Sequence, residues 1–206
     1  MTGERLGGSG AVLTVELERA RIAGEAGQAV ILVEGVSDQR AVEALARRQE
    51  RDLEAEDTTV IPIAGATNLA RFLDLLGPDG HDVPLAGLCD AGEELEYGRT
   101  LEAAGVGLRF DRVGMEQAGF YVCETDLEDE LIRALGADRM VELIESQRHL
   151  RRFRSFQNQP AQRHKTIEQQ LWRWLGNHKI RYAPLMVDAL DIDAMPRPLR
   201  GVLAQL

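Results

Sequence analysis

Carboxylate side chains follow three short apolar segments of this sequence, each at the point where the segment ends. The segments and their acids are residues 29–33 with Glu34 and Asp38, residues 83–89 with Asp90, and residues 119–123 with Glu124, Asp126 and Glu128. Short runs of β-branched and apolar residues are typical of strands that parallel sheets bury on both faces. Open α/β sheets place their ligands outside the carboxyl ends of such strands. We therefore expect these carboxylates to converge on one crevice.

Carboxylates gathered in one crevice repel one another, so they cannot all stay ionised unless cations neutralise them. Oxygen ligands of this kind favour Mg²⁺, Mn²⁺ or Ca²⁺. With enough ligands, two ions about 3.5–4 Å apart can activate a water molecule and stabilise the leaving oxygen of a phosphodiester. The acids therefore predict a site for one or two ions of Mg²⁺, Mn²⁺ or Ca²⁺ that could support phosphoryl transfer.

Positive charge is concentrated elsewhere, between Ser146 and Ile167, a stretch that contains no acid. The candidates for binding nucleic acid in this stretch are Arg148, Arg151, Arg152, Arg154 and Arg163. An acidic cluster beside a basic segment suits a metal site next to a path for phosphates. Two differently charged helix surfaces would produce the same pattern. The net charge of −10 argues against a general binder of polyanions.

Strand and helix patterns alternate along the first two thirds of the chain. We expect strands over residues 29–33, 58–65, 83–89 and 119–123, with a helix before the first strand over residues 11–26 and further helices over 38–51, around 69–76, up to 104 and up to 136. Ser37 is expected to cap the second helix, and Pro62 indicates an edge strand. Strand followed by helix, four times over, predicts an α/β fold: a Rossmann-like parallel sheet of about four strands with helices on both faces.

The expected domain organisation has three parts. Residues 1–28 form a flexible N-terminus and a leading helix, residues 29–136 form the α/β domain, and residues 137–206 form a mainly helical extension packed on it. Within the extension we expect one helix over residues 138–154 and another over 166–175. Pro184 and later prolines are expected to punctuate the tail.

Composition places the chain among ordinary globular proteins. Of its 206 residues, 44% are hydrophobic and 28% are charged, which excludes disorder throughout. No apolar run approaches the roughly 20 residues that span a bilayer, and the first residues lack the pattern of a signal peptide. Cys89 and Cys123 form no C-x-x-C motif, so we expect reduced thiols in the core of a cytoplasmic protein.

Three motifs together resemble a TOPRIM domain, the fold shared by topoisomerases, primases and certain nucleases. They are Val33-Glu34-Gly35-x-x-Asp38, the turn at Asp90, and Asp126-Leu127-Glu128-Asp129. Residues 63–69 and 126–131 look most like the overcoming-lysogenization-defect (OLD) type of nuclease. The resemblance covers about residues 29–136, and the tail only more weakly. Such enzymes usually join an ABC-type ATPase to the TOPRIM domain; this sequence has no G-x-x-x-x-G-K-[ST] motif, so it looks like the TOPRIM half alone.

The resemblance implies a Mg²⁺-dependent nuclease, with one or two ions of Mg²⁺ or Mn²⁺ as the expected cofactor, and a role for each matching residue. Glu34 would be a metal ligand or general acid/base, and the implied metal ligands are Glu34, Asp38, Asp90, Glu94, Asp126 and Glu128. Lys165 would match a family lysine that stabilises phosphate charge. The implied partners are DNA, a separate ABC-type ATPase and a second copy of the chain, without a membrane.

One departure from the family pattern leaves two alternatives open. The third motif is typically Asp-x-Asp, but here it reads Asp90-Ala91-Gly92, with Glu93 and Glu94 following at once. A degenerate TOPRIM module that binds nucleic acid or an ATPase without cutting is one alternative, and an α/β phosphohydrolase with one Mg²⁺ is the other. Glu128 also has a structural alternative, because Thr125-x-x-Glu128 fits a capping box.

Overall fold

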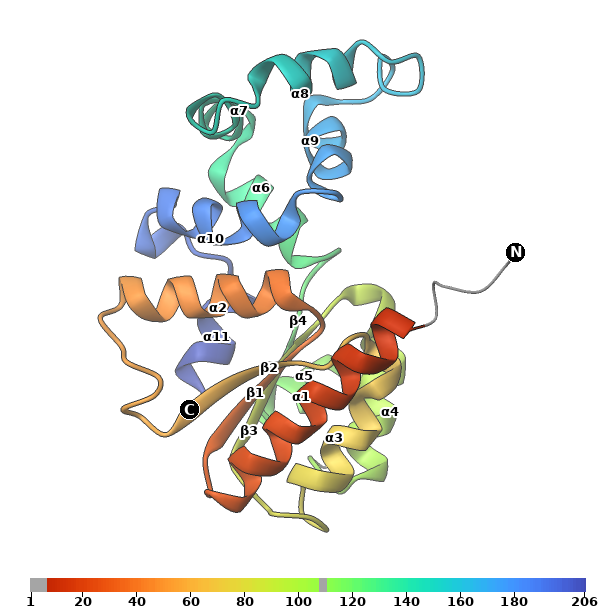
Figure 1. The fold of residues 1–206 in the computed structure, drawn as a ribbon, viewed down its shortest axis with the longest axis vertical. Helices are drawn as coiled ribbons and strands as arrows, with labels where there is room; N and C mark the ends of the chain where they lie inside the picture. The colour runs from red at the N-terminus through yellow and green to blue at the C-terminus, as the bar shows by residue number, and fades with distance from the viewer. Residues whose placement is uncertain (1–6, 108–110) are drawn as a thin grey trace.

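A computed structural model describes residues 7–107 and 111–206, and within these ranges it contains one four-stranded parallel sheet (Figure 1). The strands are β1 (Ala29–Val33), β2 (Thr58–Pro62), β3 (Leu85–Cys89) and β4 (Phe120–Val122), and they lie in the order β2-β1-β3-β4. The predicted α/β fold is therefore confirmed. Pro62 ends β2, which is an edge strand as expected.

Helices surround the sheet and extend beyond it. Their bounds are α1 (Gly7–Glu25), α2 (Val36–Arg48), α3 (Leu69–Leu76), α4 (Glu94–Ala103), α5 (Arg112–Gln117), α6 (Leu127–Leu135), α7 (Ala137–Ser146), α8 (Leu150–Gln157), α9 (Ile167–Leu175), α10 (Lys179–Ala189) and α11 (Arg197–Ala204). Short 3₁₀ turns cover Ala66–Asn68, Ala91–Glu93 and Ile192–Ala194. In the described ranges no helix is long and apolar enough to cross a membrane.

The central strand β1 is buried on both faces, which explains its unbroken apolar sequence. Ile31 and Val33 belong to the core on one face of the sheet, whereas Val30 and Leu32 belong to the core on the other. Helices α1, α3, α4 and α5 cover the second of these faces, and α2, α6, α10 and α11 cover the first (Figure 1).

The C-terminal helices are part of the main core. α10 lies against α2, and α11 contacts α2, β3 and β4. Arg48 of α2 donates to the carbonyl oxygen of Val187 at 2.6 Å and to that of Leu190, which ties the end of α10 to α2. Helices α7, α8 and α9 form an arm at the top of Figure 1, with α10 between this arm and α2.

Three expectations about the helices are corrected. The single helix expected over residues 138–154 is two, because Arg148 adopts a left-handed φ of 60° between α7 and α8. Pro184 lies inside α10 rather than in an irregular tail, since packing against α2 outweighs the local cost of proline. Helix α5 was not expected at all; the side chain of Asp111 caps it by accepting from Gly114 N at 2.8 Å.

The N-terminal expectation is changed in part. Helix α1 begins at Gly7, not at residue 11, so the glycine-rich residues 7–10 belong to its first turns. Residues 1–6, which were expected to be flexible, lie outside the described part of the chain.

Candidate metal centre

The carboxyl edge of the sheet carries a group of five acids, which we call the acidic crevice. Its members are Glu34 after β1, Asp38 in the first turn of α2, Asp90 after β3, and Asp126 and Glu128 at the start of α6. The charges of the other four act on Asp90, so the structure brings together five of the six predicted metal ligands. Parallel strands explain this, because their carboxyl ends share one edge.

Helix α2 holds Asp38 through its own first turn. Gly35 is the N-cap residue, with extended backbone, and its N–H donates to Asp38 Oδ2 at 2.9 Å. The prediction that Ser37 caps this helix is therefore wrong, because Asp38 supplies the side-chain contact. Ser37 is instead buried inside the first turn, 1% exposed.

Helix α6 is capped by Asp126, and this excludes the capping box expected between Thr125 and Glu128. Asp126 Oδ1 accepts from the N–H of Asp129 at 2.7 Å, and its Oδ2 accepts from Trp172 Nε1 of α9, also at 2.7 Å. Glu128 therefore takes no part in the cap. It is buried, 5% exposed, with Lys179 Nζ 3.8 Å from its Oε2.

Two carboxylate oxygens of the acidic crevice are buried without a partner. Among the described residues, Glu34 Oε2 and Glu128 Oε1 have no hydrogen bond, and such burial is costly. These oxygens suit a hard divalent cation in their chemistry. Within the same residues, however, no three Asp, Glu, His or Cys side chains are arranged to hold a metal ion as they stand.

Burial and repulsion by neighbouring charges raise the pKa values of three acids in the acidic crevice, Asp38, Asp90 and Glu128. Burial, followed by the charge of Glu128, raises the pKa of Asp38 to about 7, against the Gly35 N–H and Lys179. Burial, followed by the charges of Glu34 and Asp38, raises the pKa of Asp90 to about 8. Burial also raises the pKa of Glu128, which Lys179 opposes. The crevice therefore has more negative charge than Lys179 offsets, which a bound cation would relieve.

Glu94, the sixth predicted ligand, has a different partner. Its two carboxylate oxygens accept from Arg112 Nε at 3.2 Å and Nη2 at 2.5 Å. Glu94 is also absent from the charges that act most strongly on Asp90. The structure therefore holds Glu94 outside the acidic crevice.

The other acids between residues 116 and 130 form ion pairs with arginines. Glu116 lies 2.5 Å from Arg197, and Arg133 lies within 3.2 Å of Glu124, Asp129 and Glu130. For these acids the structure agrees with the alternative given in the sequence analysis, ordinary charged side chains rather than metal ligands.

Lys179, and not Lys165, is the lysine beside the acids. Lys165 is half-buried in the loop before α9. Lys179 is the first residue of α10, and its ammonium group interacts electrostatically with Glu128, Asp38 and Asp90. Lys179 and Trp172 are the residues of this site that the sequence analysis missed. The available signal was that the chain has only two lysines.

The predicted nucleic-acid-binding arginines are spread over the arm. Arg148 joins α7 to α8, while Arg151, Arg152 and Arg154 lie on α8. Arg163 lies in the loop after α8, where its Nε donates to the carbonyl of Asn158 at 2.8 Å.

A cavity of about 410 Å³ adjoins the acidic crevice. Its lining residues are Asp126, Glu128, Phe156, Gln162, Trp172, Arg173, Gly176 and Lys179. Trp172 is 41% exposed, so this aromatic side chain is open to solvent beside the candidate metal ligands.

Comparison with known proteins agrees with this arrangement. Residues 27–91 match the family model "Overcoming lysogenization defect protein-like, TOPRIM domain". The C-terminal region of the Xanthomonas campestris pv. campestris OLD protein, in the structure phased with platinum, has a TM-score of 0.68 and 26% identity, over 86% of this chain and 91% of that one. The C-terminal region of the Burkholderia pseudomallei OLD protein has a TM-score of 0.65 and 22% identity, over 86% and 95%. No curated protein matches the chain in sequence.

The pKa values of Asp38 and Asp90 predict how stability depends on pH when divalent ions are removed by EDTA. Both values lie above the ordinary ~3.9 of an unfolded aspartate. Between the unfolded and the folded pKa the native state therefore binds more protons than the unfolded state. The free energy of unfolding falls as the pH rises from about 4, and the fall levels off above about 7 for Asp38 and about 8 for Asp90. Urea unfolding at a series of pH values measures this fall.

Asp90→Asn is the matched variant for this measurement, because it keeps the shape of the side chain and removes its titration. We expect a shallower fall in stability with pH in Asp90→Asn than in wild type. Equal slopes of unfolding free energy against pH in the two proteins would show that the pKa of Asp90 is not raised in the native state.

Proposed function

Since the chain carries an OLD-like TOPRIM domain, we propose that it is a divalent-metal-dependent nuclease domain that cleaves DNA phosphodiesters. The observation that carries the proposal is the acidic crevice. Asp38, Asp90 and Glu128 have raised pKa values, one oxygen each of Glu34 and Glu128 is buried without a partner, and Lys179 lies beside Glu128. Structural ion-pair networks also shift pKa values, but this group lies at the strand ends where open α/β sheets bind ligands.

Glu34, Asp38, Asp90 and Glu128 are the residues that would hold Mg²⁺ or Mn²⁺. When bound, such an ion polarises a phosphate and lowers the pKa of water. Asp126 has a different task, because both of its oxygens already accept hydrogen bonds that fix the start of α6 and the position of Trp172. The main role of Asp126 is therefore to position Glu128, and not to bind the metal ion.

Two side chains of the site have different roles in the reaction at the phosphate. Glu34 has a free buried oxygen, Oε2, that can take a proton from an attacking water. Lys179 places an ammonium group at the border of the crevice, where it can donate to phosphate oxygens and stabilise the negative charge of the transition state. Lys179 thus takes the role that the sequence analysis gave to Lys165.

A non-catalytic nucleic-acid-binding module is the second candidate function. Gly92 stands where the family has a second aspartate. Glu94, a nearby acid that could replace this aspartate, is paired with Arg112 instead. Glu93 remains nearby and is half-buried. A site short of one ligand binds its ion more weakly, so activity depends on the ions that the remaining carboxylates can hold.

Cleavage of plasmid DNA with Mg²⁺ or Mn²⁺ tests the proposed function, with Glu34→Gln as the first variant. Glu34→Gln keeps the side chain's size but removes its charge, and we expect the rate to fall by about 100-fold or more. Gel analysis of nicked and linear products over time measures the rate.

Glu124→Gln is the control, because this exposed acid pairs with Arg133 outside the crevice. The control is expected to cleave as wild type does. Equal rates in Glu34→Gln and wild type would refute the assigned mechanism, and DNA binding without cleavage by any metal-loaded protein would favour the non-catalytic module.

The two lysines provide a second, matched comparison. Lys179→Met is expected to lower the cleavage rate by about 100-fold, because it removes the positive charge next to Glu128. Lys165→Met removes the same charge elsewhere and is expected to change the rate less than about threefold. If the Lys165 variant were the inactive one, the assignment of Lys179 would be wrong.

Gly92→Asp is expected to complete the third motif. A Cβ at Gly92 would meet no atom within 4 Å, so an aspartate fits without displacing a neighbour. We expect Mn²⁺ to bind roughly tenfold more tightly by calorimetry, a gain of about 1.4 kcal/mol. Gly92→Asn is the control without the added charge, and equal affinities in the two variants would show that position 92 does not face the ion.

A further inference from the structure

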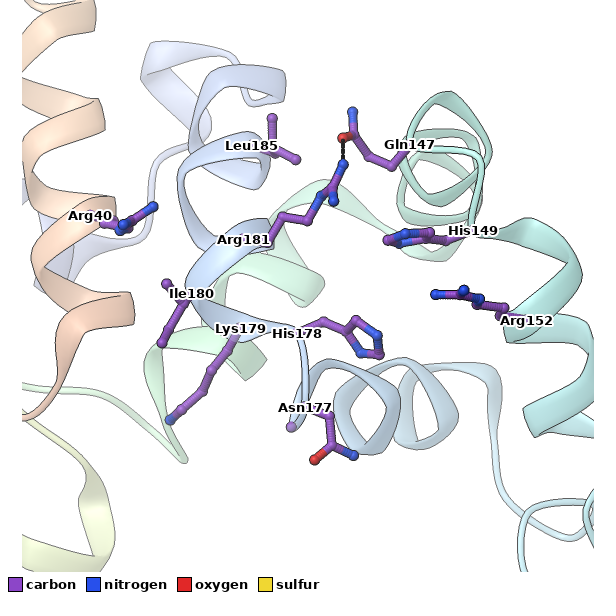
Figure 2. A pocket seen from close by; sticks show the side chains of 11 residues that line it. Arg40, Gln147, His149, Arg152, Asn177, His178, Lys179, Ile180, Arg181 and Leu185 are labelled. Carbon is purple, nitrogen blue, oxygen red and sulfur yellow. Dashed lines mark hydrogen bonds between the residues drawn. The ribbon is translucent and has the colours of Figure 1, made fainter. Parts of the chain in front are cut away.

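A second hollow, of about 770 Å³, has Lys179 among its lining residues (Figure 2). We call it the basic hollow. It is bordered by α2, the α7–α8 junction, α8 and the first turns of α10, and its lining residues are Arg40, Gln147, His149, Arg152, Gly176, Asn177, His178, Lys179, Ile180, Arg181 and Leu185. Figure 2 shows His149, Arg152 and His178 together on the side of the arm, with Arg40 across the hollow on α2.

The basic hollow is strongly positive in a protein of net charge −10. Arg40, Arg152, Lys179 and Arg181 line it, and none of its lining residues is an acid. Among the described residues, none of the three arginines forms an ion pair, so their charges are available to a ligand. Such a concentration of like charge in one concave surface attracts anions.

Neighbouring side chains hold several of these groups in place. Gln147 Oε1 accepts from Arg181 Nη2 at 3.0 Å (Figure 2). The ring of His178 stacks on Trp174, with centroids 4.2 Å apart, and its Nδ1 donates to the Trp174 carbonyl at 2.9 Å. Partial burial, followed by the charges of Arg181 and Arg152, lowers the pKa of His149. The hollow is therefore largely preformed, and its own charges already act on one another.

The basic hollow adjoins the cavity beside the acidic crevice. Lys179 and Gly176 line both this hollow and the cavity that contains Asp126 and Glu128. A chain of phosphates can occupy both places at once, whereas a single phosphate cannot. This shared border therefore favours a nucleic-acid strand over a small anion.

We propose that the basic hollow binds the DNA phosphates that flank the phosphate held at the acidic crevice. The proposal rests on the proposed function and deepens it, because it assigns the backbone contacts to particular residues. Arg152 and Arg181, with Arg40 across the hollow, make these contacts. Arg148, Arg151, Arg154 and Arg163 do not line the hollow and contribute little.

Fluorescence anisotropy with a labelled DNA duplex tests this assignment. All proteins carry Glu34→Gln so that Mg²⁺ can be present while cleavage is suppressed, and the test variant adds Arg152→Gln and Arg181→Gln. We expect binding about tenfold weaker or worse, and a slope of log K against log salt that is smaller by about 1–2 between 50 and 200 mM salt, since each phosphate contact contributes about 0.9.

Arg151→Gln with Arg154→Gln is the matched control, because it removes the same charge from exposed positions of α8 outside the hollow. This control is expected to bind within about twofold of its parent. Equal losses in the two double variants, no loss in either, or no binding by the parent would each overturn the proposal. Displacement of the duplex by inorganic phosphate at millimolar concentration would also overturn it, by showing a small-anion site.

Cleavage by the same double variants in the chain with Glu34 intact separates this proposal from the proposed function. If the hollow binds flanking phosphates uniformly, Arg152→Gln with Arg181→Gln raises KM and leaves kcat unchanged. Loss of binding in proteins that never cleave DNA would support the hollow and refute the nuclease. Cleavage with unchanged KM would support the nuclease and refute the hollow.

Discussion

Electrostatic repulsion among buried and half-buried carboxylates is the constraint around which this site is built. Glu34 and Asp90 are placed by parallel strands whose apolar cores leave no freedom to move apart. Asp38 and Asp126 are fixed by backbone N–H groups at the starts of α2 and α6. The free energy of packing two hydrophobic layers against the sheet therefore holds together charges that would otherwise separate. Such an arrangement is typical of a site that is completed by a cation.

The C-terminal helices join the acidic crevice to its surroundings. Because α10 packs along α2, its first residue, Lys179, reaches Glu128. Because α9 packs on α6, Trp172 reaches Asp126. Lys179 then borders two regions of opposite charge, the acidic crevice and the basic hollow. A phosphate chain crossing Lys179 would meet the candidate metal ligands on one side and the arginines of the basic hollow on the other.

The departure at Gly92 decides how complete the acidic crevice is. Glu94, which follows it by two residues, is fixed by Arg112 of α5, a helix that the sequence analysis did not expect. The ion pair with Arg112 therefore competes with any role of Glu94 as a replacement for the missing aspartate. Glu34, Asp38, Asp90 and Glu128 remain as candidate metal ligands, with Asp126 in a supporting position. The raised pKa values of Asp38, Asp90 and Glu128 are consistent with a site that lacks positive charge.

Local sequence patterns were enough to determine the strands, their parallel arrangement, the edge position of Pro62 and the five acids at the carboxyl edge, because strand burial and strand ends are written in consecutive residues. The helix caps were harder to predict from the sequence. Thr125 and Asp126 are both possible N-caps of α6, and Asp126 also accepts a hydrogen bond from the distant Trp172. Tertiary structure alone decided the rest. The pairs Glu128–Lys179, Asp126–Trp172 and Glu94–Arg112 join residues far apart in the chain. Only packing of helix on helix brings such residues together, and no local periodicity records it.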